Sequence, residues 1–122
     1  MENIIETADE WMERVNAKDV AGLLAVSDHN IEMIGPAGSG VGHDTLKQWV
    51  MENSHIHLAT QNRYAKGDKV VYEQVGTWDD ERGKVTIYTY MEIKHNKVCE
   101  IARYDTLDDA FGSSGLNEED KI

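Results

Sequence analysis

The chain has 122 residues and a formal net charge of −11 at pH 7, from 23 acidic and 12 basic side chains. A chain of this length forms one domain around a single core. The negative charge disfavours nucleic acid and anionic membrane surfaces as partners, because their phosphate groups would be repelled.

The first residues have the pattern of two helices. Apolar residues recur at helical spacing over 4–15, which predicts a first helix. Asn3 and Glu6 are placed as a cap pair at the start of this helix. Asp19 can cap a shorter helix over 20–24. We expect the longer helix to cover the core through its apolar stripe.

One strand and a third helix follow. The pattern predicts a polar turn over 27–30 and a strand over Ile31–Ile34, which Pro36 ends because proline cannot donate to a sheet ladder. A flexible glycine-rich loop over 38–42 then precedes a helix that Asp44 can cap. This helix places three apolar residues on one face: Leu46, Trp49 and Val50.

The second half of the chain is rich in Val, Ile, Thr and Tyr, which are typical of strands. Turn residues at 66–68, 80–83 and 95–96 separate the strands, and the last break is short enough for a tight hairpin. The predicted strands are His55–Tyr64, Lys69–Trp78, Lys84–Lys94 and Lys97–Asp105. Helices followed by strands predict an α+β domain, with helices on one face of an antiparallel sheet.

The end of the chain has a different composition. We expect a short helix over Leu107–Phe111 and a loosely ordered acidic tail over 112–122, so the predicted domain covers residues 1–111. The N-terminal region lacks the basic start and apolar run of a signal peptide, and no apolar run could span a bilayer. The single cysteine, Cys99, cannot form an internal disulfide. We therefore expect a cytoplasmic protein.

The order of elements over residues 15–50 resembles the amino-terminal half of the nuclear transport factor 2-like superfamily, which includes ketosteroid isomerases and SnoaL-like polyketide cyclases. The resemblance implies a cone-shaped, curved mixed or antiparallel sheet wrapped around the N-terminal helices, also described as a cystatin-like α+β barrel. It further implies a small apolar or semi-polar organic ligand in the cone. We also expect no cofactor, no bound metal and a homodimer formed through the outer sheet face.

Asp105 is the best catalytic candidate. The segment Ala102-Arg103-Tyr104-Asp105 resembles the strand end at which superfamily members place an acid after an aromatic residue. In the polyketide cyclase and epoxide hydrolase branches an aspartate of this kind acts as a base. The alternative is that Asp105 starts the next turn or pairs with Arg103.

Other positions depart from the catalytic branches. Where the resembling ketosteroid isomerases have an aspartate and a tyrosine, this chain has Gly35 and Trp11. Glycine cannot transfer a proton, and an indole is a weak donor, so that mechanism is not supported. The epoxide hydrolase branch needs an arginine and a second aspartate on a neighbouring strand, and residues 85–94 contain neither.

Two further side chains are candidates for moving a proton. His55 and His57 share one strand face, and a pair of His57 and Asp105 would form a proton relay, although both histidines could instead be solvated strand-edge groups. A metal would need a third ligand that the sequence does not supply. Tyr90 is a candidate donor, but alternation alone leaves open whether its face or that of Thr89 lines the cone.

The function predicted from these patterns is binding of a small molecule, with an isomerase, cyclase or dehydratase-type reaction at Asp105 as one outcome. A non-catalytic ligand-binding or protein-interaction module of the same fold is the alternative, and the missing isomerase acid favours it. The predicted ligand wall could equally be ordinary core or dimer surface; it consists of Trp11, Met33, Trp49, Tyr72, Trp78 and Tyr104.

Overall fold

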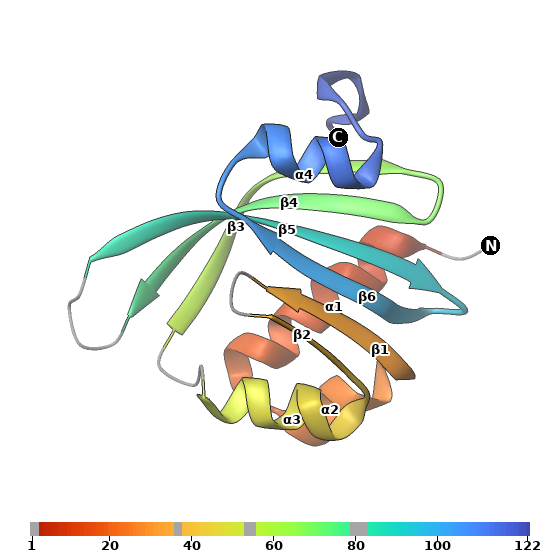
Figure 1. Ribbon diagram of the computed structural model, residues 1–122, viewed down its shortest axis with the longest axis vertical. Helices are drawn as coiled ribbons and strands as arrows, with labels where there is room; N and C mark the ends of the chain where they lie inside the picture. Colours follow the sequence, from red (N-terminus) through yellow and green to blue (C-terminus); the bar gives the residue numbers. More distant parts are fainter. Residues whose placement is uncertain (1–2, 36–37, 53–55, 79–82) are drawn as a thin grey trace.

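The computed structural model describes residues 3–35, 38–52, 56–78 and 83–122. A six-stranded sheet curves around three N-terminal helices, and the C-terminal helix crosses its other face (Figure 1). The helices are α1 (Ile4–Ala17), α2 (Val20–Ala25), α3 (His43–Glu52) and α4 (Leu107–Ser114), followed by a 3-10 turn, η1 (Glu118–Asp120). The strands are β1 (Ser27–Gly35), β2 (Gly38–Val41), β3 (Ile56–Lys66), β4 (Lys69–Trp78), β5 (Lys84–Lys94) and β6 (Lys97–Tyr104).

The strand order is β2-β1-β6-β5-β4-β3, and only the β1–β6 pair is parallel in the described sheet. The predicted meander of β3 to β6 and the mixed α+β cone are both confirmed. The hairpin between β5 and β6 turns at His95 and Asn96, whose φ angles of 56° and 61° suit a type I′ turn. Two predicted caps are also present, since Asn3 accepts from the amide of Glu6 and Asp19 from that of Gly22.

The structure differs from the predicted elements around β1. This strand begins at Ser27 instead of Ile31, because Ser27 is buried and already pairs with Val98 of β6. Part of the predicted glycine loop is an edge strand, since β2 pairs with β1 in an antiparallel register. Pro36 and His55 lie outside the described residues.

The C-terminal residues form a longer helix than predicted and make contacts with β3. Helix α4 continues to Ser114, and Gly115 ends it with a φ of 79°, a conformation that favours glycine. Beyond η1, the amide of Ile122 donates to the carbonyl of Arg63 at 2.9 Å, and Lys121 forms an isolated bridge with Tyr64. The end of the chain therefore pairs with β3 at the edge of the sheet.

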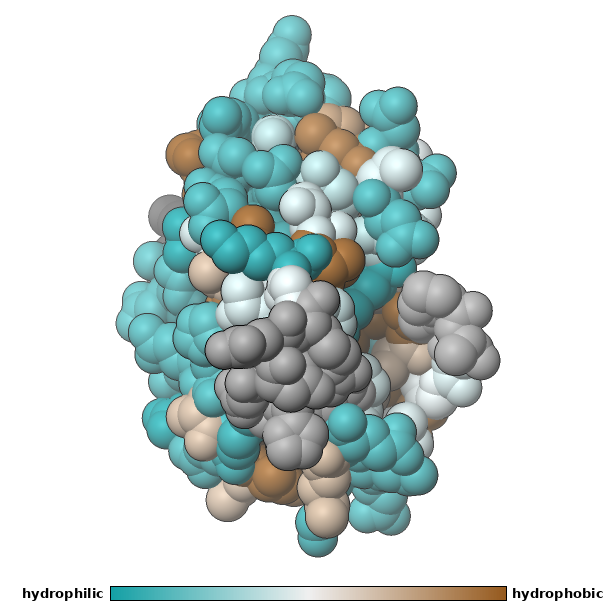
Figure 2. Space-filling model, turned by 90° about the vertical axis from the view of Figure 1, so that its left-hand side faces the viewer, coloured by the Kyte–Doolittle hydropathy of each residue, from teal (hydrophilic) through white to brown (hydrophobic). Residues whose placement is uncertain are grey.

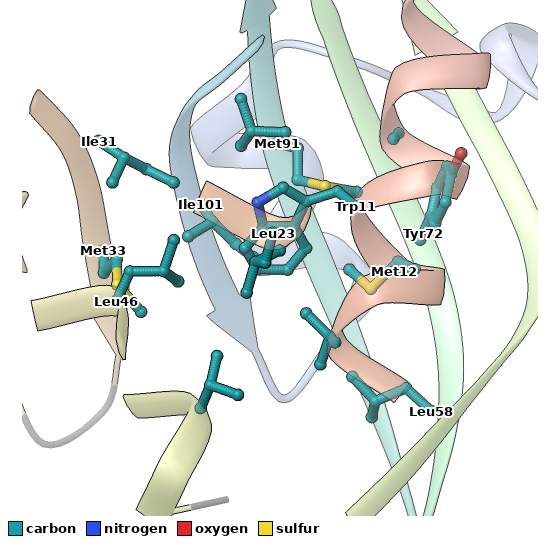
Figure 3. Packing of buried hydrophobic residues seen from close by; sticks show 14 of the residues in the cluster. Trp11, Met12, Leu23, Ile31, Met33, Leu46, Leu58, Tyr72, Met91 and Ile101 are labelled. Atoms are coloured by element: carbon teal, nitrogen blue, oxygen red, sulfur yellow. The ribbon is translucent and has the colours of Figure 1, made fainter. Parts of the chain in front are cut away.

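The sheet separates two apolar clusters. The inner cluster lies between the sheet and helices α1 to α3 (Figure 3) and includes Trp11, Met12, Leu23, Ile31, Met33, Leu46, Leu58, Tyr72, Met91 and Ile101. The outer cluster lies beneath α4 and consists of Tyr64, Val71, Tyr90, Ala102, Ala110 and Leu116. Alternation along β5 and β6 thus places Met91 and Ile101 inside the cone and Tyr90 and Ala102 outside it.

Candidate functional site

Arg103, near the end of β6, projects into the cone. On this strand Ile101 belongs to the inner cluster and Ala102 to the outer one, so alternation returns Arg103 to the inner side. Arg103 pairs across the sheet with Thr89 of β5. Its guanidinium carbon lies 4.4 Å from the centroid of the Trp49 ring, which α3 supplies. Strand β6 and helix α3 therefore meet through a cation stacked on an aromatic ring.

The guanidinium group of Arg103 is incompletely satisfied. Its Nε and Nη2 atoms are shielded from solvent and have no hydrogen-bond partner. Burial lowers the pKa of Arg103 to about 10, so the group remains protonated at neutral pH. The ion pairs within the described ranges involve Arg14, Arg63 and Lys94, and none includes Arg103. A buried positive charge thus lacks a negative partner from the described part of the chain.

The other arginine near the inner cluster is paired. Arg63 donates from Nε to Asp9 Oδ1 at 3.0 Å, and the hydroxyl of Tyr72 donates to the same oxygen at 2.6 Å. Burial and the hydrogen bond to Asp9 both raise the pKa of Tyr72. These three groups tie α1 to β3 and β4. Among the described residues, the fold therefore supplies a carboxylate to Arg63 and none to Arg103.

The polar side chains beside Arg103 bind one another. The hydroxyl of Thr89 donates to Gln74 Oε1 at 2.7 Å, and Gln74 Nε2 donates to the hydroxyl of Thr60 at 3.1 Å. Thr89 and Gln74 are both fully buried. This row crosses β5, β4 and β3 on the inner face, and its internal bonds satisfy the groups that burial would otherwise leave unpaired.

The predicted catalytic residues do not meet in the cone. Asp105 is exposed in the bend between β6 and α4. His57 is exposed on β3, between the buried residues Ile56 and Leu58, and so points outward. Tyr90 lies in the outer cluster, where burial and the nearby Glu100 raise its pKa. None of these three residues belongs to the inner cluster around Arg103.

Most of the predicted ligand wall does face inward. Met33, Trp49, Tyr72 and Trp78 all lie in or against the inner cluster. Tyr104 differs, because it packs against the outer cluster on the opposite side of the sheet.

Trp11 also faces inward, but it is sealed within the core. The residue is fully buried, and its indole Nε1 donates to the hydroxyl of Ser27 at 2.9 Å. Its ring centroid lies 6.3 Å from that of Trp49, which is only partly buried. The aromatic path from core to site thus runs from Trp11 through Trp49 to the guanidinium of Arg103.

Sequence reasoning did not identify Arg103 as a binding residue. The sequence predicts Arg103 only as a possible partner of Asp105, and the structure has no ion pair between these two described residues. The available signal was alternation, because a strand that places Ile101 in the core also directs the side chain two residues later to that face.

Other parts of the described chain offer less chemistry. A surface depression of about 300 Å³ beside α1 is open and bears no cationic side chain; its lining is Asn3, Glu6, Thr7, Glu10 and Asn96. Within the described ranges, no three His, Cys, Asp or Glu side chains are placed to hold a metal ion. No described helix combines the length and apolar character needed to cross a membrane. Much of the side shown in Figure 2 is hydrophilic, which agrees with the net charge of −11.

No protein-family model matches the chain, and no curated protein matches it by sequence. Solved structures do match. A nuclear transport factor 2-like protein of unknown function from Cytophaga hutchinsonii superposes with a TM-score of 0.75 at 10% identity, over 91% of this chain and 96% of that one. The chain has the nuclear transport factor 2-like fold.

Two further solved structures share this fold. A candidate polyketide cyclase from Sinorhizobium meliloti has a TM-score of 0.74 at 11% identity, over 81% of this chain and 94% of its own. TerC, co-crystallised with polyporic acid, has a TM-score of 0.70 at 16% identity, over 91% of this chain and 96% of its own. These neighbours share the fold at 10–16% identity, and fold alone does not assign an activity.

Proposed function

We propose that this protein binds a small organic molecule inside its cone, between α3 and the inner face of the sheet. The observation that carries this proposal is the pair of buried, unpartnered donors on Arg103. A buried polar group without a partner is costly, so natural proteins leave one mainly where something else completes it. Partly buried apolar side chains of the inner cluster, among them Trp49 and Trp78, would surround the ligand.

The fold neighbours support a small-molecule ligand in general terms. TerC was crystallised with polyporic acid, and the Sinorhizobium meliloti protein is a candidate polyketide cyclase. Both have the same cone at low sequence identity, so they support the class of ligand and not its identity.

Binding is better supported than turnover. A catalytic cone of the predicted kind needs a carboxylate inside it, beside a donor. Asp105 is exposed, and the group that faces inward is a cation. A reaction at Asp105 stays a prediction, to be tested once a ligand is known: Asp105→Asn should abolish its conversion and leave it bound.

The homodimer remains a prediction, and α4 covers part of the outer sheet face that it would use. Helix α4 covers the outer cluster, including Tyr64, Val71 and Tyr90. A dimer through the outer sheet face would have to use the strands that α4 leaves open, and light scattering coupled to size exclusion would measure the oligomeric state. The cytoplasmic location also remains a prediction.

The methionines allow a direct test of where a ligand binds. Met33 lies on the inner face of β1, paired with Ile101 of β6, whereas Met51 is 65% exposed on α3. With methyl-¹³C methionine, titration by the neutral dye N-phenyl-1-naphthylamine should shift the Met33 resonance and leave that of Met51 unchanged. Shifts confined to Met51, or no shift with this dye or a wider set of apolar compounds, would reject a ligand site in the cone.

A further inference from the structure

The two unpartnered donors of Arg103 form one edge of its guanidinium group. In arginine, the Nε hydrogen and the adjacent Nη2 hydrogen point in nearly parallel directions in the guanidinium plane. These are the two nitrogen atoms that lack partners. Two parallel N–H donors match the two oxygens of a carboxylate, which makes this edge a typical site for bidentate recognition.

A neutral partner would satisfy this edge only in part. A carbonyl group or a water molecule accepts hydrogen bonds but leaves the buried positive charge without compensation. The neighbouring Thr89 hydroxyl donates to Gln74. Because no described carboxylate pairs with Arg103, a negative charge has to come from outside this part of the chain.

The surroundings of the arginine indicate the rest of the ligand. Trp49 stacks on the guanidinium and also contacts Trp11, so the surface next to the charge is aromatic. Met33, Trp78 and Ile87 add apolar side chains to the same inner cluster. A ligand that reaches Arg103 would therefore place an apolar body against these groups.

We propose that the ligand is a small organic carboxylate with an apolar body, whose two oxygens accept hydrogen bonds from Nε and Nη2 of Arg103 while the body contacts Trp49. This inference rests on the proposed small-molecule site in the cone and adds the charge and shape of what binds there. A carboxylate would complete both donors and neutralise the charge in one step.

The test compares matched acids and amides. Benzoate, 2-naphthoate and decanoate are titrated by calorimetry against benzamide, 2-naphthamide and decanamide, so that each pair differs in charge but little in shape. The proteins are wild type, Arg103→Met, Arg103→Lys and the control Lys97→Met, which removes one positive charge from the exposed start of the same strand.

We expect at least one acid to bind wild type roughly ten to a hundred times more tightly than its amide, the usual range for a charge-assisted pair of hydrogen bonds. Arg103→Met should abolish this preference, and Lys97→Met should keep it. Arg103→Lys should retain only part of the preference for the acid, because an ammonium group lacks the two parallel N–H donors of the guanidinium. The lysine variant also keeps the test decisive if Arg103→Met does not fold.

Failure of this inference is distinguishable from failure of the proposed function. If the dye shifts Met33 but no acid is preferred over its amide, the cone binds small molecules and the carboxylate assignment is wrong. An acid preference that survives in Arg103→Met, or that is undiminished in Arg103→Lys, would also overturn it. If neither the dye nor any of the six compounds perturbs Met33, the ligand site itself is rejected.

Discussion

The guanidinium of Arg103 lies 4.4 Å from the centre of the Trp49 ring, and this contact joins β6 to α3 without a carboxylate. Stacking of a cation on an aromatic ring contributes about 0.5–2 kcal/mol, which does not offset the removal of a charged group from water. Burial of the Arg103 charge therefore costs more than the stacking contact returns.

The first prediction is that Arg103→Met stabilises the unliganded protein. Methionine matches the aliphatic part of the arginine side chain out to the position of Nε, and it carries no charge to desolvate. We expect the free energy of unfolding to rise by about 1–2 kcal/mol, measured by urea denaturation at pH 7. A stability gain combined with loss of acid binding is the pattern of a functional group held at the expense of stability. Destabilisation of similar size would instead show that Arg103 has a structural role.

The second prediction concerns two tyrosines. Burial raises the pKa of both Tyr72 and Tyr90, with a further contribution from Asp9 for the former and Glu100 for the latter. A raised folded-state pKa means that the associated stability is fully present below the unfolded value of about 10 and is lost as pH rises through the folded value.

In a pH titration followed by tyrosinate absorbance at 295 nm, part of the absorbance change should therefore occur at a pH above the usual tyrosine pKa of about 10. Tyr72→Phe and Tyr90→Phe should each reduce the size of this part. Unfolding of the protein should accompany this part of the titration. Ionisation of both tyrosines near pH 10 in a protein that remains folded would contradict the burial described for them.

The cone could be predicted from the sequence because its causes are local. Capping residues such as Asn3 and Asp19, the two-residue turn at 95–96 and the strand periodicity of the second half each act over a few neighbours. The edge strand β2 is harder to predict from the sequence, because it forms by pairing with β1 and its own glycine-rich sequence does not favour a strand.

The candidate site was harder to predict for a physical reason. The resemblance predicts Asp105 because relatives have an acid at this strand end, but the exposure of Asp105 depends on how the chain turns after β6. The importance of Arg103 lies in a missing partner. Pairing depends on three-dimensional neighbours from α3 and β5, so no spacing in the sequence reveals it.

The third prediction concerns a row of carboxylates on the outer face. Glu100 of β6 is paired across the sheet with Glu92 on one side and Glu32 on the other. Burial and these like charges raise the pKa of Glu100. A raised folded-state pKa gives stability that is present below the unfolded value of about 4.3 and is lost as pH rises through the folded value.

Glu100→Gln should therefore increase stability at pH 7 and have little effect at pH 4. We expect a gain below about 1 kcal/mol, because solvent screens a partly exposed carboxylate. Thermal unfolding at the two pH values measures the difference. An equal effect at both pH values would show that packing, and not charge, is responsible.

The fourth prediction concerns the C-terminal cover of the sheet. Leu116 is 5% exposed within the outer cluster. The rings of Phe111 of α4 and Tyr64 pack edge to face, with their centroids 5.1 Å apart. Leu116→Ala should lower the free energy of unfolding by about 2–4 kcal/mol through the cavity it leaves. The control Ile122→Ala, at a side chain that is 65% exposed, should change it by less than about 0.5 kcal/mol.

Loosening this cover has a second consequence. The apolar surface under α4 would be exposed more often, so Leu116→Ala should self-associate more than wild type in light-scattering measurements at matched concentration. If the variant is as stable as wild type and no more associated, α4 does not protect the outer face.

The fifth prediction separates the core from the ligand site. The indole of Trp11 donates to Ser27, whose hydroxyl in turn donates to the carbonyl of Leu23 at 2.7 Å. Ser27→Ala leaves a buried indole N–H without an acceptor and should cost about 1–3 kcal/mol of stability, measured by urea denaturation. The control Ser113→Ala, on the exposed side of α4, should be nearly neutral.

Because Trp11 is fully buried, the affinity of Ser27→Ala for its preferred acid should equal that of wild type under conditions where both are folded. Weaker binding at unchanged stability would place Trp11 in contact with the ligand instead of in the core behind Trp49.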